Sequence, residues 1–427
     1  MKKYLQQIWY EMRHQPLIGI VTLSATALAI FLIMVVVTIQ QVKVAPFAPE
    51  INRDRMLAGH GMHVKSLSRN EDGSAMAISP AALHELYDSL PGVKALSVYV
   101  ERNMENISVT GRTSMTAEVL DNDEKFWDIF SFEFIDGKPY DKAAVEAGMK
   151  EAVISESVAR RMFDTGKASG REIKIAHIPY RVVGVVKDVS PLATAAYANV
   201  FIPYTSQPGN TRASEYGELF GALEAFMLID EHASVPDIKK EVERRYSILS
   251  SRLKKQDQEV LYHGQPYTQE ERITSHGSNN TPDTETDRNL RYAIYVILLL
   301  IPAINLGSIT QSRLRRRISE IGIRRAFGCT RRRVILDILV ENFIISLAGG
   351  IIGLLLAICF SYFYTGIFSD INPEYPTPQI DFSMIFHTST FFAALLFCFL
   401  LNLISAGLPA WRASRVNPVE AINSVHK

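Results

Sequence analysis

Four long apolar runs interrupt an otherwise mixed chain, and they predict its organisation. The first, Leu17–Ile39, has no charged side chain, and as a helix rising about 1.5 Å per residue it would span about 35 Å. The others are Leu290–Thr310, Ile338–Ile367 and Ile385–Ala410. Each can cross a hydrocarbon core of about 30 Å. The pattern therefore predicts an integral membrane α-helical protein with four transmembrane helices.

The region between the first two runs, residues 43–289, alternates between helical and strand periods. One apolar stripe predicts an amphipathic helix at 235–253, and Ser79 followed by Pro80 predicts the start of a shorter helix. We expect a large α+β domain in which a β-rich subdomain, about 106–205, is inserted in an α/β subdomain. Strands are expected at 94–100, 106–111, 117–121, 171–175, 180–186, 199–204 and 224–230, with small helices after Asp123 and Ser155 and a connecting loop at 265–287.

Basic residues in short loops mark the cytoplasmic side of a membrane protein. They occur before the first run, in the coupling segment 311–337 between the second and third runs, and after the fourth. The turn at 368–384 has three acidic residues and no basic one, which fits the outer side. Both termini, a helix at 1–16 and a tail at 411–427, are therefore predicted to be cytoplasmic, and residues 43–289 to be extracytoplasmic. The basic residues concerned are Lys2, Lys3, Arg13, Arg313, Arg315, Arg316, Arg317, Arg324, Arg325, Arg331, Arg332, Arg333, Arg412 and Arg415.

A cleavable signal peptide is the alternative for the first run. Its apolar core is too long for one, and no small-x-small cleavage site follows it. An uncleaved anchor is therefore the better interpretation. The cysteines agree with this topology, because Cys329, Cys359 and Cys398 all lie outside residues 43–289. The external domain must fold without disulfides.

Composition and motifs argue against several activities. The 45 basic and 45 acidic side chains give no net charge, so no global field attracts nucleic acid. Neither Gly137 nor Gly166 belongs to the GxxxxGK phosphate loop that nucleotide binding would require. His60 and His63 lack a third ligand at useful spacing. We expect no catalytic residue, no metal site and no cofactor in this chain.

Several residues inside the third run are unusual for a membrane helix. Glu341 lies one or two turns inside it, where a charge is costly. It is either functional, or its carboxylate reaches the inner headgroup layer or pairs with a neighbouring arginine such as Arg333. Gly349, Gly350 and Gly353 form small-xxx-small patterns that allow another helix to approach closely. The sequence leaves open whether that helix belongs to the same chain or to a second copy.

The coupling segment alternates arginines with apolar residues. Glu320 and Arg324 have the i,i+4 spacing of a helical ion pair, so a short amphipathic helix is expected. Such a helix could lie on anionic lipid, or its apolar residues could dock in a groove of a soluble partner. The apolar residues are Ile318, Ile321, Ile323, Ala326 and Phe327, with glycines at 322 and 328.

These segments resemble a known family. RRRISEIGIRRAFGCTRRRVILDILVEN, at 315–342, and PAWRASRVNPVEAI, at 409–422, resemble the signatures of FtsX-like/MacB-like ABC transporter permeases. Residues 151–204 resemble the MacB-type periplasmic domain. Phe327 and Cys329 replace the more usual leucine and alanine of the family.

The resemblance implies an ABC permease subunit of the bacterial inner membrane, without enzymatic activity of its own. A separate ATPase would bind ATP and Mg²⁺, a second permease copy or paralogue would complete a dimer, and an adaptor and outer-membrane channel could join. Mechanotransmission would drive export of a peptide, macrolide or similar substrate; the alternatives are a lipoprotein-releasing or cell-division-type permease and a membrane sensor. The resemblance gives the ATPase-coupling role to Glu320, Ile321, Gly322, Ile323, Arg324, Arg325, Ala326, Phe327 and Gly328.

Overall fold

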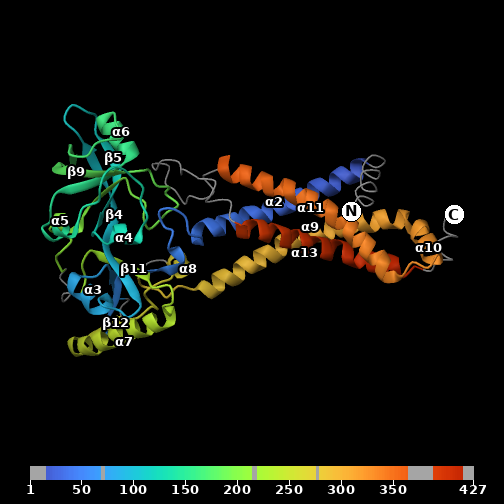
Figure 1. Ribbon diagram of the computed structural model, residues 1–427. Helices are drawn as coiled ribbons and strands as arrows, with labels where there is room; N and C mark the ends of the chain where they lie inside the picture. Colours follow the sequence, from blue (N-terminus) through green and yellow to red (C-terminus); the bar gives the residue numbers. More distant parts are fainter. Residues whose placement is uncertain (1–15, 69–72, 214–218, 276–277, 364–387, 417–427) are drawn as a thin grey trace. The chain divides into compact units, whose positions relative to one another are not determined.

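The computed structural model describes residues 16–68, 73–213, 219–275, 278–363 and 388–416. The chain divides into two compact units, one comprising Met1–Val42 with Arg288–Lys427 and the other Lys43–Asp287. The helix predicted at 1–16 lies, except for Pro16, outside the described residues, as do the turn predicted at 368–384 and most of the predicted tail. Figure 1 shows the elements of each unit.

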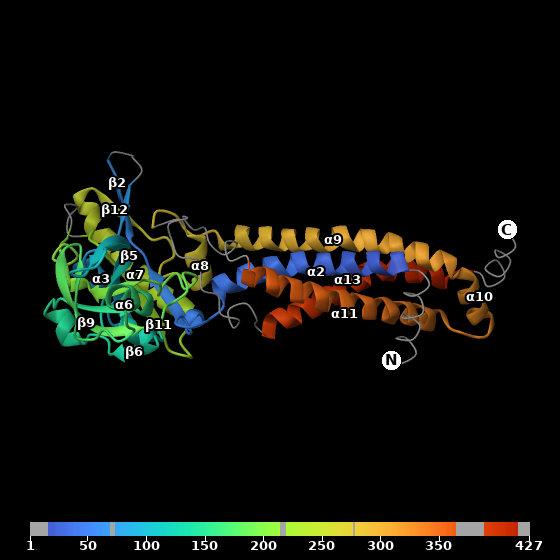
Figure 2. The same cartoon turned by 90° about the horizontal axis from the view of Figure 1, so that it is seen from above.

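The first unit is helical. Four long helices, α2, α9, α11 and α13, run alongside one another (Figure 2). The short helix α10 lies between α9 and α11 in the chain. Each long helix contributes buried residues to one apolar core, among them Ile30, Leu306, Ala357 and Leu401. The helices are α2 (Pro16–Val44), α9 (Thr284–Arg316), α10 (Ile318–Ala326), α11 (Arg331–Phe363) and α13 (Thr388–Ser414).

Three helices of the described chain are long and apolar enough to cross a membrane: Gly19–Val44, Arg331–Phe363 and Phe392–Ser414. They correspond to the first, third and fourth predicted spans. The second predicted span, residues 290–310, lies within the continuous helix α9, and its membrane crossing stays a prediction.

The glycines of α11 lie where other helices of the same chain come closest. A Cβ added at Gly353 would lie 2.5 Å from the carbonyl oxygen of Ala27 on α2, and one added at Gly349 would lie 2.8 Å from Cβ of Thr26. A Cβ added at Gly350 would collide with Sγ of Cys398 on α13. The neighbours of this small-residue surface are therefore α2 and α13.

Replacing Gly353 by alanine should lower the free energy of unfolding by about 1–3 kcal/mol, because the new methyl group overpacks against backbone. Gly407 is the matched control: no atom lies within 4 Å of its added Cβ, so Gly407→Ala should be neutral or stabilising. Thermal unfolding in detergent compares the two. Equal losses from both variants would contradict close packing at Gly353.

The second unit is built on a nine-stranded sheet of order β1-β11-β4-β5-β10-β7-β9-β6, and β8 pairs with both β4 and β9. That double pairing closes β4, β5, β10, β7, β9 and β8 into a ring. The strands are β1 (Met56–Gly59), β4 (Val93–Ser108), β5 (Met115–Asn122), β6 (Phe134–Gly137), β7 (Glu151–Ser155), β8 (Glu172–Ile175), β9 (Ile178–Val186), β10 (Val200–Pro203) and β11 (Leu223–Ile229).

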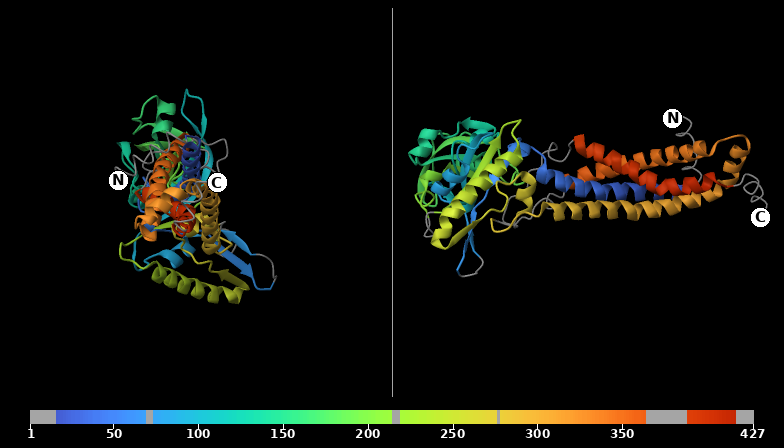
Figure 3. Two further views of the ribbon diagram at one scale, coloured as in Figure 1. Left: turned by 90° about the vertical axis from the view of Figure 1, so that its right-hand side faces the viewer. Right: turned by 90° about the horizontal axis from the view of Figure 1, so that it is seen from below.

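The described part of this unit also contains a smaller sheet and six α-helices. The long helix α7 runs along its outside (Figure 3) and packs its buried stripe against α3 and the strands β4 and β11. The smaller sheet has the order β12 (Gln258–Leu261), β2 (Met62–Ser66), β3 (Ser74–Met76). The helices are α3 (Pro80–Tyr87), α4 (Phe126–Ile129), α5 (Lys142–Glu146), α6 (Glu156–Phe163), α7 (Val235–Leu253) and α8 (Gln269–Thr274).

Four helix predictions in this unit are confirmed, including the small helices after Asp123 and Ser155, which are α4 and α6. The Ser79 hydroxyl accepts a hydrogen bond from the backbone N–H of Ala82 and caps α3, as its position before Pro80 predicts. Helix α7 has the predicted bounds, and its whole predicted stripe is buried: Ile238, Val242, Tyr246, Leu249 and Leu253.

Two other predictions are wrong. The strands expected separately at 94–100 and 106–111 form one strand, β4, with an irregularity between Val100 and Asn103. Its first half pairs with β11, and its second half pairs with β8 in the ring. The loop expected at 265–287 contains α8, which Thr268 and Glu271 start with a reciprocal capping box; the turn-forming residues around it obscured that signal.

Candidate functional site

Helix α10 ends in a turn that only a residue with positive φ accommodates well. Gly328 has φ +90°. Its N–H donates to the carbonyl of Arg325, and the N–H of Cys329 donates to the carbonyl of Arg324, which together form a Schellman motif. Helix α10 ends at Ala326, and the motif makes Phe327 its C-cap, immediately before the reversal.

The apolar residues of α10 divide between two faces. Ile321 and Gly322 are buried, and Ile321 packs with Leu314 and Val334 in a small core. Ile323 is 47% exposed and Phe327 is 88% exposed. Because Ile323 and Phe327 are spaced i,i+4, they share one face of the helix. The sequence identified the apolar residues of this segment, but it did not predict that Ile323 and Phe327 are exposed while Ile321 and Gly322 are buried.

The arginines of α10 have different roles. Arg324 is exposed and pairs with Glu320, which confirms the predicted i,i+4 ion pair. Arg325 is half-buried and donates through Nη1 to the carbonyl oxygens of Ser414, at 3.0 Å, and Val416, at 2.7 Å. A cation at the carbonyl end of a helix is favourable, so Arg325 holds α10 against the end of α13.

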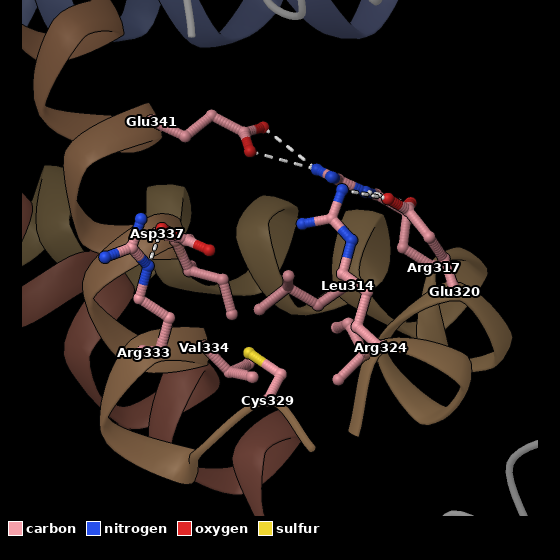
Figure 4. Close-up of a pocket in the computed structure, with 11 residues that line it drawn as sticks. Leu314, Arg317, Glu320, Arg324, Cys329, Arg333, Val334, Asp337 and Glu341 are labelled. Carbon is pink, nitrogen blue, oxygen red and sulfur yellow. Dashed lines mark hydrogen bonds and ion pairs between the residues drawn. The ribbon is translucent and has the colours of Figure 1, made fainter. Parts of the chain in front are cut away.

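Behind α10 lies a cavity of about 140 Å³ between α9, α10 and α11 (Figure 4). Arg317, at the break between α9 and α10, bridges both sides of it. Its Nη1 lies 3.1 and 3.0 Å from the two carboxylate oxygens of Glu341, and its Nε lies 3.1 Å from Glu320. The charged side chains that line the cavity are Arg317, Glu320, Arg324, Arg333, Asp337 and Glu341.

Glu341 pairs with a neighbouring arginine, one of the alternatives that the sequence left open, but that arginine is Arg317 and not Arg333, the example given. Arg333 pairs with Asp337, one turn along its own helix, at 3.5 Å. Arg317 reaches Glu341 because the chain reverses between them, which places residues 24 positions apart side by side. The sequence predicts a reversal between the second and third spans, but it does not predict which side chains the reversal brings together.

Removing the Glu341 carboxylate should destabilise the helical unit. The side chain of Glu341 is 7% exposed and that of Arg317 is 19% exposed, so Glu341→Ala leaves a largely buried cation without this partner. We expect a loss of about 3 kcal/mol in the free energy of unfolding, and partial recovery in the double variant Glu341→Leu with Arg317→Met. Chemical denaturation in detergent measures both. Equal stability of the single and double variants would contradict a buried ion pair.

The histidines considered as metal ligands lie in the second unit and have other partners. Nδ1 of His60 lies 3.2 Å from the carboxylate of Glu224. His63 stacks on His263, with Nδ1 and Nε2 of the two rings 2.9 Å apart. No group of three side chains suited to a metal ion occurs among the residues that the structure describes.

Two family profiles match the chain. The MacB-like periplasmic core domain matches residues 20–245, and the FtsX-like permease C-terminal domain matches residues 292–418. The chain belongs to the FtsX/MacB-like permeases. Helix α10, its cavity and Glu341 all fall within the FtsX-like match, and the nine-stranded sheet falls within the MacB-like match.

Curated relatives of this permease carry the name macrolide export ATP-binding/permease protein MacB. One from Shewanella oneidensis is 27% identical over 318 residues, which cover 73% of this chain and 44% of that protein. One from Acinetobacter baylyi is 24% identical over 337 residues, which cover 78% and 46%. The chain thus spans about half the length of the curated relatives it matches.

Solved structures of low overall similarity also match. The periplasmic region of MacB from Actinobacillus actinomycetemcomitans has a TM-score of 0.34 and 17% identity, covering 48% of this chain and 87% of that one. A domain of a permease protein from Porphyromonas gingivalis has a TM-score of 0.37 and 17% identity, covering 51% and 91%.

Proposed function

We propose that this permease couples ATP hydrolysis by a separate ABC ATPase to conformational change across the membrane. In this proposal the ATPase binds the permease at helix α10. The observation that carries the proposal is the outward pair of Ile323 and Phe327 at a rigidly terminated helix end. An aromatic side chain that is almost fully exposed and flanked by arginines has the composition of an interface anchor.

The contacts behind α10 support transmission into the membrane helices. Arg325 attaches α10 to the end of α13, and Arg317 attaches the start of α10 to Glu341 on α11. Buried ion pairs and carbonyl caps are directional, so a displacement of α10 would pull on both helices. In this mechanism four spans, including residues 290–310, tilt together while the ATPases close and open.

The direction of transport and the partners follow from the same proposal. The relatives are named for macrolide export, which favours export of a macrolide, peptide or similar substrate over lipoprotein release. The permease would act as a dimer, with an adaptor and outer-membrane channel as further partners. Both termini and α10 would be cytoplasmic, and residues 43–289 would be periplasmic.

The sidedness of α10 provides the direct test. In a variant without Cys329, Cys359 and Cys398, a new cysteine at the exposed Arg332 should react with a membrane-impermeant maleimide only after the inner leaflet is opened. A second variant, with the cysteine at the exposed Lys142 of the other unit, should react from the outside. Labelling of Arg332→Cys in sealed cells would place α10 where no ATPase could reach it and would overturn the proposal.

A further inference from the structure

A second cavity, of about 500 Å³, lies within the unit formed by Lys43–Asp287. Sites for small ligands typically occupy about 300–1,000 Å³. The cavity opens between β3, the strands β4 and β11, and helix α8. The side chains that could recognise a ligand are His60, Tyr99, Glu101, Arg102, Glu224 and Arg272.

One wall of this cavity is apolar and aromatic. The rings of Tyr99 and Phe226 stack with centroids 4.3 Å apart and planes 7° apart, and Leu120 and Ala195 extend the same wall. Tyr99 is 7% exposed and Ala195 4%, whereas Phe226 and Leu120 are 1% exposed, so Tyr99 provides most of the open surface and Phe226 supports its ring from behind. This wall can receive the hydrocarbon or aromatic part of a ligand.

The two arginines of the cavity, Arg272 and Arg102, donate hydrogen bonds to neutral groups, although the charges of Glu50 and Glu224 act on Arg272. Arg272 donates to the amide oxygen of Gln269, at 3.2 Å, and to the hydroxyl of Thr194, at 2.7 Å, and both partners are neutral. Burial lowers the pKa of Arg272, although the nearby Glu50 opposes that shift. Arg102 donates to the neutral carbonyl of Tyr197. Two guanidinium groups with neutral hydrogen-bond partners, one of them poorly solvated, favour a carboxylate or similar anion.

Two carboxylates line the cavity: Glu224, which is hydrogen-bonded within the protein, and Glu101, which is exposed. Glu224 accepts a hydrogen bond from the Tyr99 hydroxyl and lies 3.2 Å from His60. Burial raises the pKa of Glu224, but the hydrogen bonds with His60 and Tyr99 and the charge of Arg272 outweigh that effect, so the net pKa is lowered. Glu101 is exposed at the cavity. Two carboxylates beside two guanidinium groups would repel a dianion. The cavity therefore favours a ligand that carries one negative and one positive charge.

We propose that this cavity binds a small zwitterion with an apolar body, such as an amino acid or a short peptide. Arg102 and Arg272 bind its carboxylate, Glu101 attracts its ammonium group, and the wall of Tyr99 and Phe226 covers its side chain. The site lies entirely within the one unit and does not depend on ATPase coupling.

Four probes that share a phenyl ring but carry different charged groups test which charges the cavity recognises. They are phenylalanine, 3-phenylpropionate, phenethylamine and phenyl phosphate. We expect calorimetry on the full-length protein in lipid nanodiscs to show phenylalanine binding most tightly, 3-phenylpropionate next, and phenethylamine not at all. Phenyl phosphate should bind more weakly than the monocarboxylate. Strongest binding of phenyl phosphate would replace the zwitterion site by a phosphate site, and binding of no probe at its solubility limit would overturn the proposal.

Variants test the assigned residues. Arg102→Gln should weaken phenylalanine binding about tenfold or more, since a charge-assisted contact is lost. Arg112→Gln is the matched control, because Arg112 is exposed and pairs with Asp164 outside the cavity. Glu101→Gln should weaken phenylalanine and leave 3-phenylpropionate unchanged or tighter, a reversal that loss of folding cannot produce. Equal affinity of wild type and Arg102→Gln for phenylalanine would overturn the assignment.

Discussion

Phe327→Glu should abolish recovery of an ABC ATPase with the purified permease while leaving the permease folded. Phe327 is 88% exposed, so its replacement removes little intramolecular packing. Truncating a central aromatic anchor of an interface costs about 2 kcal/mol or more, which is at least a thirtyfold loss of affinity, and a carboxylate adds the cost of a buried charge. Co-purification from membranes of a host that expresses the ATPase measures the loss.

Two further variants give this experiment its controls. Ile248→Glu changes another exposed apolar residue, on α7 of the other unit, and should leave recovery unchanged. Phe327→Leu restores the residue more usual in the family and should retain binding. Arg325→Glu is not a clean test of the interface, because it also releases α10 from the carbonyls of Ser414 and Val416. Full recovery of the ATPase with Phe327→Glu would remove α10 as its docking element.

Arg53→Ala should lower the free energy of unfolding of the second unit by about 3–5 kcal/mol. The side chains of Arg53 and Glu50 are 1% and 0% exposed and pair at 2.5 Å. Glu50 also accepts the N–H groups of Ala195 and Ala196, and Arg53 donates to the carbonyl of Leu192. Removing the guanidinium leaves a buried carboxylate without its counter-charge, which costs far more than the pair itself contributes.

An exposed ion pair of the same unit is the control. The side chains of Lys142 and Glu146 are 73% and 68% exposed, so Lys142→Ala should cost about 1 kcal/mol or less. The double variant Glu50→Met with Arg53→Leu should recover part of the loss, because apolar groups need no counter-charge. Urea denaturation followed by tryptophan fluorescence separates the three. A loss below about 1 kcal/mol for Arg53→Ala would show that water reaches the pair.

Patterns within single segments predicted a good part of this fold. The apolar stripe of Val235–Leu253 and the cap at Ser79 are properties of a few neighbouring residues, and the structure confirms both. Three of the four apolar runs form helices long and apolar enough to span a membrane. The Glu320–Arg324 pair is equally local, since i,i+4 spacing alone brings the two charges together.

The remaining features depend on which segments meet, and no local pattern encodes that. The sequence of β4 predicts two strands because its middle is polar. The structure has one continuous strand, whose first half pairs with β11 and whose end pairs with β8. The sequence did not predict the buried ion pair of Glu50 and Arg53, because Glu50 accepts hydrogen bonds from backbone donors 145 and 146 positions away.

The sequence by itself determined three helices that are long and apolar enough to cross a membrane, the amphipathic helix Val235–Leu253, and the presence of a basic, partly apolar segment at 311–337. Only the tertiary structure decided that Ile323 and Phe327 point outward, that Arg325 holds α13, and that Arg317 pairs with Glu341. The physical reason is the same in each case. Helical period and charge spacing follow from the geometry of one segment, whereas exposure and ion-pair partners follow from chain reversals that bring distant segments together.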